Sequence, residues 1–133
     1  MVRVYADVVG DLFHVGHINL FKQARKLGDY LIVGVHSDKA VASYKRIPIL
    51  DENTRYEIIK NCRLVDQVII DAPLTLTKSF IRNNKIDIVA HGNDTNPNFA
   101  EQHKAAIDMG IMKYLKYTPG ISTTDIINKI KEL

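Results

Sequence analysis

The sequence predicts an α/β domain in which helices cover both faces of a five-stranded parallel sheet. Short apolar segments of strand length alternate along the chain with longer segments whose apolar residues recur at helical spacing. Several short segments, such as residues 30–36 (YLIVGVH), are apolar on both faces, which is typical of strands buried between two helical layers. The 133 residues fit one domain, and no linker or repeat divides them.

Five segments are predicted to be strands because they are short, apolar and rich in branched residues. They are residues 2–8, 30–36, 67–70, 86–90 and 111–117. In a parallel sheet, ligands bind beyond the carboxyl ends of the strands. The loops that follow the strands are therefore the places to search for functional residues, namely residues 9–17, 37–46, 71–76, 91–99 and 118–123.

Five helices are predicted from apolar spacing and from capping residues. The first spans residues 17–27, and Gly28 fits its end. Further helices are expected from a cap at Asp51 to about Lys60, from Thr77 to about Asn83, over residues 100–109, and from Ser122 onward.

Composition excludes several classes of protein. A net charge of +3, with Lys and Arg spread along the chain, does not indicate nucleic-acid binding. No apolar stretch approaches the roughly 20 residues that span a bilayer, and the first residues do not resemble a secretory signal. The single cysteine, Cys62, leaves no internal disulfide. We therefore expect a cytoplasmic protein without a membrane segment or a nucleic-acid partner.

The loop after the first predicted strand contains His14-Val15-Gly16-His17. Two imidazoles three residues apart can donate hydrogen bonds to one anion, and a glycine lets the backbone approach a ligand closely. The amides at the start of the following helix also favour phosphate. Histidines that merely cap or pack, and a zinc site, are the alternatives. No Cys or His with motif-like spacing supplies further zinc ligands, so we predict no protein-held metal.

Two motifs in this order resemble a known family. Residues 14–17 match the HxGH signature of the nucleotidylyltransferase superfamily, and residues 120–124 (GISTT) match the end of the RTEGIST motif of its cytidylyltransferase branch. Residues 28–38, 72–77 and 91–94 are similar to segments of phosphoethanolamine and phosphocholine cytidylyltransferases. The resemblance covers nearly the whole chain and implies a single Rossmann-like, nucleotide-binding domain over residues 1–133.

The resemblance also implies a reaction. The phosphate of a small phosphorylated alcohol, such as phosphoethanolamine or phosphocholine, attacks the α-phosphorus of CTP, and pyrophosphate leaves. Mg²⁺ is expected to accompany CTP, held mainly by phosphates and water. By this resemblance His14, His17 and Lys45 are catalytic: the histidines bind triphosphate oxygens, and Lys45 bridges the reacting phosphates.

The nucleotide-binding residues that the resemblance implies lie mostly in loops after strands. Asp94 would accept a hydrogen bond from the cytosine amino group, while Ser122 and Thr123 would bind the outer phosphates. The full set is Val9, Gly10, Asp11, Gly16, Arg55, Gly92, Asn93, Asp94, Tyr117, Thr118, Gly120, Ile121, Ser122 and Thr123.

The sequence departs from the family at two motifs. Residues 8–11 (VVGD) replace the usual GxFD, while Tyr117 and Pro119 stand where RTEGIST has arginine and glutamate. A tyrosine cannot supply the charge of a guanidinium group. Three alternatives therefore stay open: a polyol-phosphate (such as glycerol 3-phosphate) or phosphonate acceptor, an adenylyltransferase, and a retired enzyme that only binds nucleotide.

A homodimer is the predicted assembly. Arg63-Leu64-Val65-Asp66 resembles the RYVD segment that helps to form the dimer interface in this family.

Overall fold

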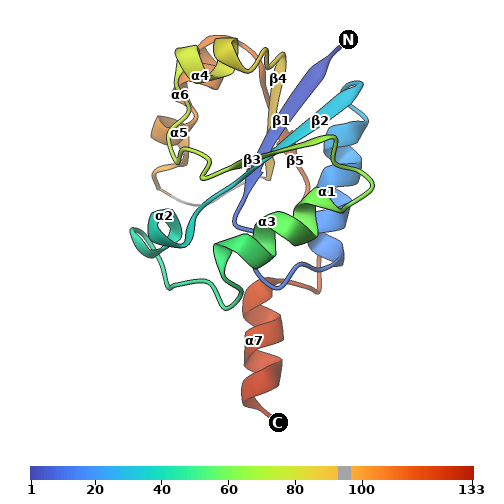
Figure 1. Ribbon diagram of the computed structural model, residues 1–133, viewed down its shortest axis with the longest axis vertical. Helices are drawn as coiled ribbons and strands as arrows, with labels where there is room; N and C mark the ends of the chain where they lie inside the picture. The colour runs from blue at the N-terminus through green and yellow to red at the C-terminus, as the bar shows by residue number, and fades with distance from the viewer. Residues whose placement is uncertain (93–96) are drawn as a thin grey trace.

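The computed structural model describes residues 1–92 and 97–133, and its centre is a five-stranded parallel sheet (Figure 1). The strand order is β3-β2-β1-β4-β5. The strands are β1 (Arg3–Val8), β2 (Tyr30–Val35), β3 (Gln67–Ile70), β4 (Ile88–Gly92) and β5 (Met112–Leu115). The predicted fold class is confirmed.

Helices cover both faces of the sheet. One face packs against α1 (Val15–Arg25) and α3 (Glu52–Lys60), and the other against α4 (Lys78–Asn83) and α6 (Lys104–Asp108). Successive side chains of β1 point to opposite faces of the sheet. Ala6 packs on the face covered by α1, and Tyr5 packs on the face covered by α4. Asp7, two residues after Tyr5, therefore lies on the α4 face.

The strand order identifies where a ligand can enter. The chain passes from β1 outward to β2 and β3, and then crosses to β4 on the other side of β1. The carboxyl ends of β1 and β4 therefore flank a topological switch point, the usual place for a binding crevice in such sheets.

Two predicted boundaries near this crevice are wrong. Helix α1 begins at Val15, two residues before the predicted start, because the side chains of His14 and His17 cap it. Sequence rules expect Ser, Thr, Asp or Asn at that position. A short helix, α2 (Asp38–Ala42), occupies part of the predicted loop 37–46, and the Ser37 side chain caps it by accepting from the Ala40 amide at 3.1 Å.

Other differences arise on the α4 side. The predicted helix 100–109 is divided into α5 (Phe99–Gln102) and α6, which meet at the buried His103. Strand β4 begins and ends two residues later than predicted, because Ile86 packs in the core before strand pairing starts. Strand β5 is shorter than the predicted range 111–117, since pairing with β4 involves only Met112 to Leu115.

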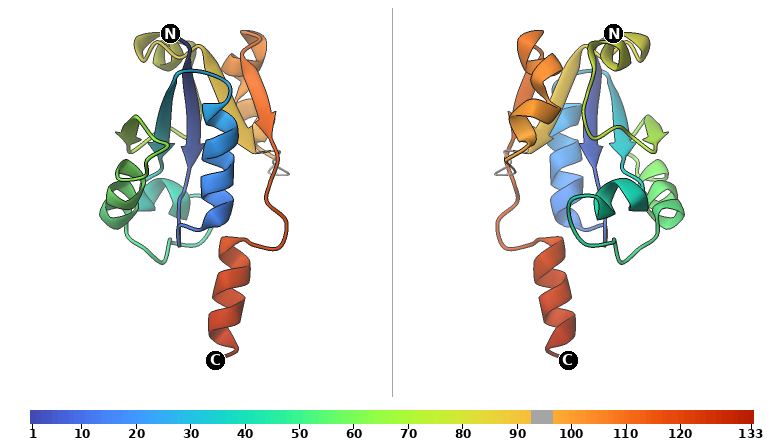
Figure 2. Two further views of the ribbon diagram at one scale, coloured as in Figure 1. Left: turned by 90° about the vertical axis from the view of Figure 1, so that its right-hand side faces the viewer. Right: turned by 90° about the vertical axis from the view of Figure 1, so that its left-hand side faces the viewer.

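Helix α7 (Thr123–Lys131) follows the predicted cap, whose Ser122 Oγ accepts from the Asp125 amide at 3.0 Å. The helix projects away from the sheet and ends the chain (Figures 1 and 2), and none of its residues is buried. Within residues 1–92 and 97–133, no helix has the length and apolar character needed to cross a membrane.

Candidate active site

An open cleft of about 720 Å³ lies at the carboxyl ends of β1, β2 and β4. Its size suits a small ligand, and it coincides with the switch point. Many predicted site residues meet in its wall, namely Val9, Gly10, Asp11, His17, Lys45, Gly92, Tyr117 and Thr123.

The two motif histidines cap the beginning of α1 reciprocally. Nδ1 of His14 accepts from the Gly16 amide at 3.0 Å, and Nδ1 of His17 accepts from the His14 amide at 3.1 Å. A neutral imidazole whose Nδ1 accepts carries its proton on Nε2. The cap therefore makes both rings Nε2–H donors, and their centroids lie only 4.1 Å apart.

The surroundings keep both imidazoles neutral at physiological pH. Burial lowers the pKa of His14. Burial lowers the pKa of His17 to about 4, assisted by the neighbouring His14 and opposed by Asp11. Two neutral N–H donors at a helix N-terminus suit oxygens whose negative charge grows during a reaction.

Asp11 joins three segments around these histidines. Its carboxylate accepts from the amides of Ile49 and Leu50 at 2.8 and 2.9 Å, and its carbonyl accepts from Thr123 Oγ1 at 3.0 Å. The same hydroxyl lies 3.5 Å from Nε2 of His14. Asp11 thus brings the amino end of α7 to the start of α1.

Thr124 also lines the cleft, whereas Thr118, Gly120, Ile121 and Ser122 are not among its lining residues. Thr118 Oγ1 accepts from the Asn19 amide group at 2.9 Å, and Gly120 adopts a left-handed φ of 82°. A Cβ at Gly16 would lie 2.7 Å from Cε1 of His14 and 3.7 Å from Cγ2 of Ile121. Glycine at position 16 is therefore required by the His14 ring, a reason the sequence analysis did not anticipate.

Two basic side chains come from the loop after β2 and α2. Lys45 and Arg46 are exposed and line the cleft. Nη1 of Arg46 lies 3.6 Å from Oδ2 of Asp11. Arg46 was missed by the sequence analysis, although its position next to Lys45 on the same loop was the available signal. Together the two cations favour a polyanionic ligand.

Arg55 is fully buried, and its guanidinium group holds loops that form the cleft. Its Nη1 donates to the carbonyls of Val9 and His36 at 2.6 and 2.7 Å. Its Nε donates to the Leu50 carbonyl at 3.0 Å, and Nη2 pairs with Asp38 at 2.7 Å. Arg55 therefore joins the loops after β1 and β2 to α3. The contact with the nucleotide that was predicted for it stays a prediction.

Tyr117 and Gly92 lie together at the β4 side of the cleft. A Cβ at Gly92 would come within 2.5 Å of Cζ of Tyr117, so a larger residue at position 92 would displace this ring. Tyr117 is 55% exposed and lines the cleft. The predicted cytosine-binding residues Asn93 and Asp94 lie outside the described residues.

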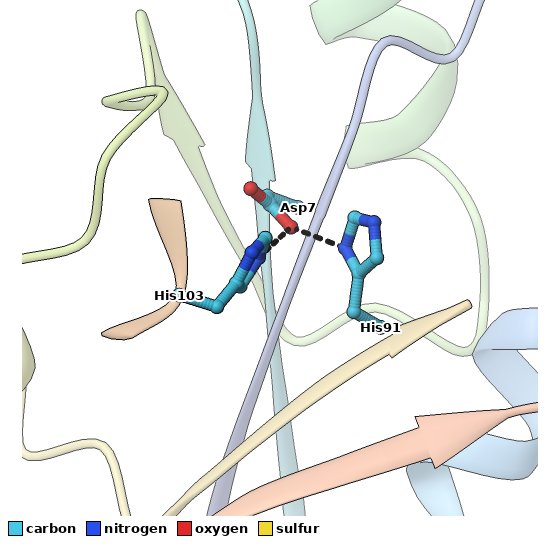
Figure 3. Close-up of side chains that lie close together, drawn as sticks. All are labelled: Asp7, His91 and His103. Atoms are coloured by element: carbon cyan, nitrogen blue, oxygen red, sulfur yellow. Dashed lines mark hydrogen bonds and ion pairs between the residues drawn. The ribbon is translucent and has the colours of Figure 1, made fainter. Parts of the chain in front are cut away.

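The floor of the cleft is a polar cluster that the sequence analysis missed. The buried carboxylate of Asp7 is surrounded by His36, His91 and His103 (Figure 3 shows Asp7 with the last two). Burial by itself would raise the pKa of Asp7, but the three neighbouring imidazoles hold it well below its usual value. Asp7, His36 and His91 come at the ends of strands and could have been suspected on that ground, whereas His103 reaches the floor from a helix junction.

Comparisons with known proteins agree with this geometry. A family model described as cytidylyltransferase-like matches residues 10–129. The chain is 40% identical over 130 residues to a probable ethanolamine-phosphate cytidylyltransferase of Encephalitozoon cuniculi, and 42% identical over 133 residues to mouse choline-phosphate cytidylyltransferase A. The alignments cover 96% and 97% of this chain, but only 40% and 36% of those proteins.

Solved structures share the fold of this chain. A lipopolysaccharide core biosynthesis protein from Thermoplasma volcanium is 34% identical and superposes with a TM-score of 0.72, covering 89% of this chain and 97% of that one. Pantoate-beta-alanine ligase from Francisella tularensis shares the fold at a TM-score of 0.58 and 14% identity, covering 99% of this chain and 70% of that one. From the family match, supported by these relatives and by the capped histidine pair at the switch point, the chain belongs to the cytidylyltransferase-like family.

Proposed function

We propose that this protein transfers CMP from CTP to a small phosphorylated alcohol and releases pyrophosphate. The observation that carries the proposal is the pair of Nε2–H donors on His14 and His17, fixed by the α1 cap beside the cleft at the switch point. The names of the relatives, ethanolamine-phosphate and choline-phosphate cytidylyltransferases, support both the nucleotide and the acceptor class.

The reaction needs alignment and charge stabilisation more than covalent chemistry. An oxygen of the acceptor phosphate forms a bond to the α-phosphorus of CTP. The bond from the α-phosphorus to the bridging oxygen breaks, and its electron pair leaves with pyrophosphate. His14 and His17 would donate to triphosphate oxygens as their charge grows, and Lys45, which lines the cleft, would neutralise both reacting phosphates.

Mg²⁺ fits this site only as a partner of the nucleotide. The carboxylates in the described wall of the cleft are Asp7 and Asp11. Three imidazoles surround the first, and backbone amides occupy both oxygens of the second. The ion would therefore arrive with CTP, be held by phosphate and water oxygens, and supply charge neutralisation.

The test is a pyrophosphate-release assay in which CTP and ATP are each combined with phosphoethanolamine, phosphocholine and glycerol 3-phosphate. We expect release with CTP and an amino-alcohol phosphate. Preference for glycerol 3-phosphate would favour the polyol alternative, and preference for ATP would contradict the proposed nucleotide. Absence of release with every pair would mean that the chain only binds nucleotide.

We further propose that residues 1–133 form one catalytic domain in the cytoplasm and pair as a homodimer through the β3 edge of the sheet. Ile70, at the end of β3, is 62% exposed. A groove beside it is lined by residues of α3 and β3, among them Tyr56 and Val68. Asp66 accepts from the Leu31 amide at 2.8 Å and pairs with Arg25, so the segment 63–66 is held firmly against the sheet. Light scattering at micromolar concentration would distinguish a dimer from a monomer.

A further inference from the structure

A carboxylate and two histidines converge at the floor of the cleft (Figure 3). Oδ1 of Asp7 lies 2.9 Å from Nδ1 of His91 and 3.8 Å from Nε2 of His103. One ligand atom from each of the three residues lies within 4.8 Å of the other two. The side chains of Asp7 and His103 are only 3% and 2% exposed. The three side chains come from β1, β4 and the junction between α5 and α6.

His103 and His36 face Asp7 in the same way, because each ring places Nδ1 on a backbone carbonyl and turns Nε2 toward the carboxylate. Nδ1 of His103 lies 3.1 Å from the carbonyl oxygen of Phe99. A carbonyl only accepts, so Nδ1 carries the proton, and a neutral ring presents an unprotonated Nε2 toward Asp7. That Nε2 is buried, and in the described part of the chain it has no hydrogen-bond partner. A bare nitrogen facing a carboxylate in a buried site is unfavourable unless a proton or a metal ion lies between them.

The surroundings of the three side chains match a metal site. A histidine that binds a metal commonly donates its other N–H to a backbone carbonyl, as His103 does to Phe99. Nε2 of His36 lies 3.3 Å from the second oxygen of Asp7, while its Nδ1 lies 3.0 Å from the carbonyl oxygen of Ala72, so His36 repeats the arrangement of His103. Neighbouring ligands in a tetrahedral zinc site are about 3.3 Å apart. The two distances from Asp7, 2.9 and 3.8 Å, bracket that value, and all three ligand atoms lie within 4.8 Å of one another.

We propose that Asp7, His91 and His103 bind a divalent transition-metal ion, Zn²⁺ above all. Two imidazoles and one carboxylate are the donors that such ions prefer, whereas Mg²⁺ prefers oxygen. All three residues line the cleft, so water or an acceptor oxygen could reach a fourth coordination position from the cleft. The site is separate from the ion that accompanies CTP, and no step of CMP transfer described above requires it.

The test measures metal binding directly. The intact protein is freed of metal with a chelator and titrated with Co²⁺, whose visible absorption reports tetrahedral coordination. We expect one Co²⁺ per chain, displacement by Zn²⁺, and no displacement by millimolar Mg²⁺. The variants His103→Asn and Asp7→Asn should each bind Co²⁺ at least about 100-fold more weakly. Because the readout is metal binding and not turnover, its failure would leave the proposed CMP transfer untouched.

The variants are chosen to keep the fold. In His103→Asn the amide nitrogen takes the place of Nδ1 and can still donate to Phe99. The double variant His14→Asn/His17→Asn is the matched control, because it removes the other histidine pair and should bind Co²⁺ normally. If circular dichroism shows that a buried variant is unfolded, His91→Gln, at a ring that is 17% exposed, replaces it. Absence of stoichiometric binding, equal affinity in His103→Asn, or loss of binding only in the control would each overturn the proposal.

Discussion

At the scale of single residues, the two nitrogens of each motif histidine have separate tasks. Nδ1 of His17 accepts from the backbone at the start of α1, which leaves Nε2–H for the cleft. A substitution can therefore remove one nitrogen and imitate the other. Asparagine places an oxygen near the position of Nδ1, whereas glutamine reaches the position of Nε2.

We predict that His17→Asn lowers kcat by about 100-fold or more, the scale of losing one donor to a developing negative charge. Its melting temperature should stay close to that of the unmodified protein, because the amide oxygen can accept from His14. His17→Gln should retain more activity and lose about 1 kcal/mol of capping energy. Steady-state kinetics and thermal melts of both variants test this. The reverse ranking in kcat would contradict the assignment of Nε2 as the reactive donor.

The low pKa of His17 also predicts how stability depends on pH. Its pKa is about 4 in the folded protein and 6.5 for an unperturbed histidine. Between these values the unfolded chain binds more protons, so stability is fully present above pH 6.5 and is lost as the pH falls toward 4. The loss should be roughly 2–3 kcal/mol. Urea unfolding at pH 7 and pH 4.5 measures it. An equal pH dependence in His17→Asn would show that His17 is not the source.

At the scale of elements, the loops that form the cleft are held in place by hydrogen bonds from single side chains. Asp11 joins the loop after β1 to residues 49 and 50 and to the start of α7. Arg55 joins the loops after β1 and β2 to α3. These contacts matter because α7 buries no residue of its own and depends on its first turn for attachment.

Arg55→Met should destabilise the protein by about 3–5 kcal/mol, the cost of breaking a buried ionic network from one side. Three carbonyl oxygens, of which that of His36 is in a fully buried contact, and the partly exposed Asp38 would lose their donor. Urea denaturation gives the difference, with Arg82→Met on the exposed side of α4 as the control. A loss no larger than that of the control would show that the loops do not depend on the guanidinium.

The elements also show which features can be read from sequence. Strand β3 and helix α3 have the predicted bounds, because a local apolar pattern and the Asp51 cap determine them. The division of α5 from α6 could not be predicted, since it depends on His103 entering a distant polar cluster. Arg55 resembles an exposed helix arginine in sequence, and only its loop partners explain why it is buried.

At the scale of the whole molecule, the strand order places sequence-distant groups on one cleft. His17 follows β1, Lys45 follows β2, Gly92 ends β4 and Thr123 begins α7. The rule that ligands bind at carboxyl strand ends predicted this edge of the sheet, and the motif resemblance selected residues along it. The polar floor was missed because no local motif joins Asp7 to His103.

A ligand that contacts all of these segments should stabilise the entire fold. We predict that CTP with Mg²⁺, at one hundred times its dissociation constant, adds about 2.7 kcal/mol, which raises the melting temperature by roughly 10 °C. ATP at the same concentration should raise it less. Differential scanning calorimetry measures both shifts. Equal shifts with all nucleoside triphosphates would mean that the cleft recognises only the phosphates.

The histidine cap of α1 implies that stability and activity respond in opposite directions to a substitution of His14. Serine or aspartate is a better helix cap than histidine, so His14→Ser should match or exceed the stability of the natural chain while losing most of its activity. Selection for thermal stability alone would then discard the reactive residue, whereas selection for turnover would retain a weaker cap. Measuring both the melting temperature and kcat of His14→Ser would show whether the variant gains stability while it loses activity. A variant that is both less stable and inactive would show instead that the imidazole is the better cap in this setting.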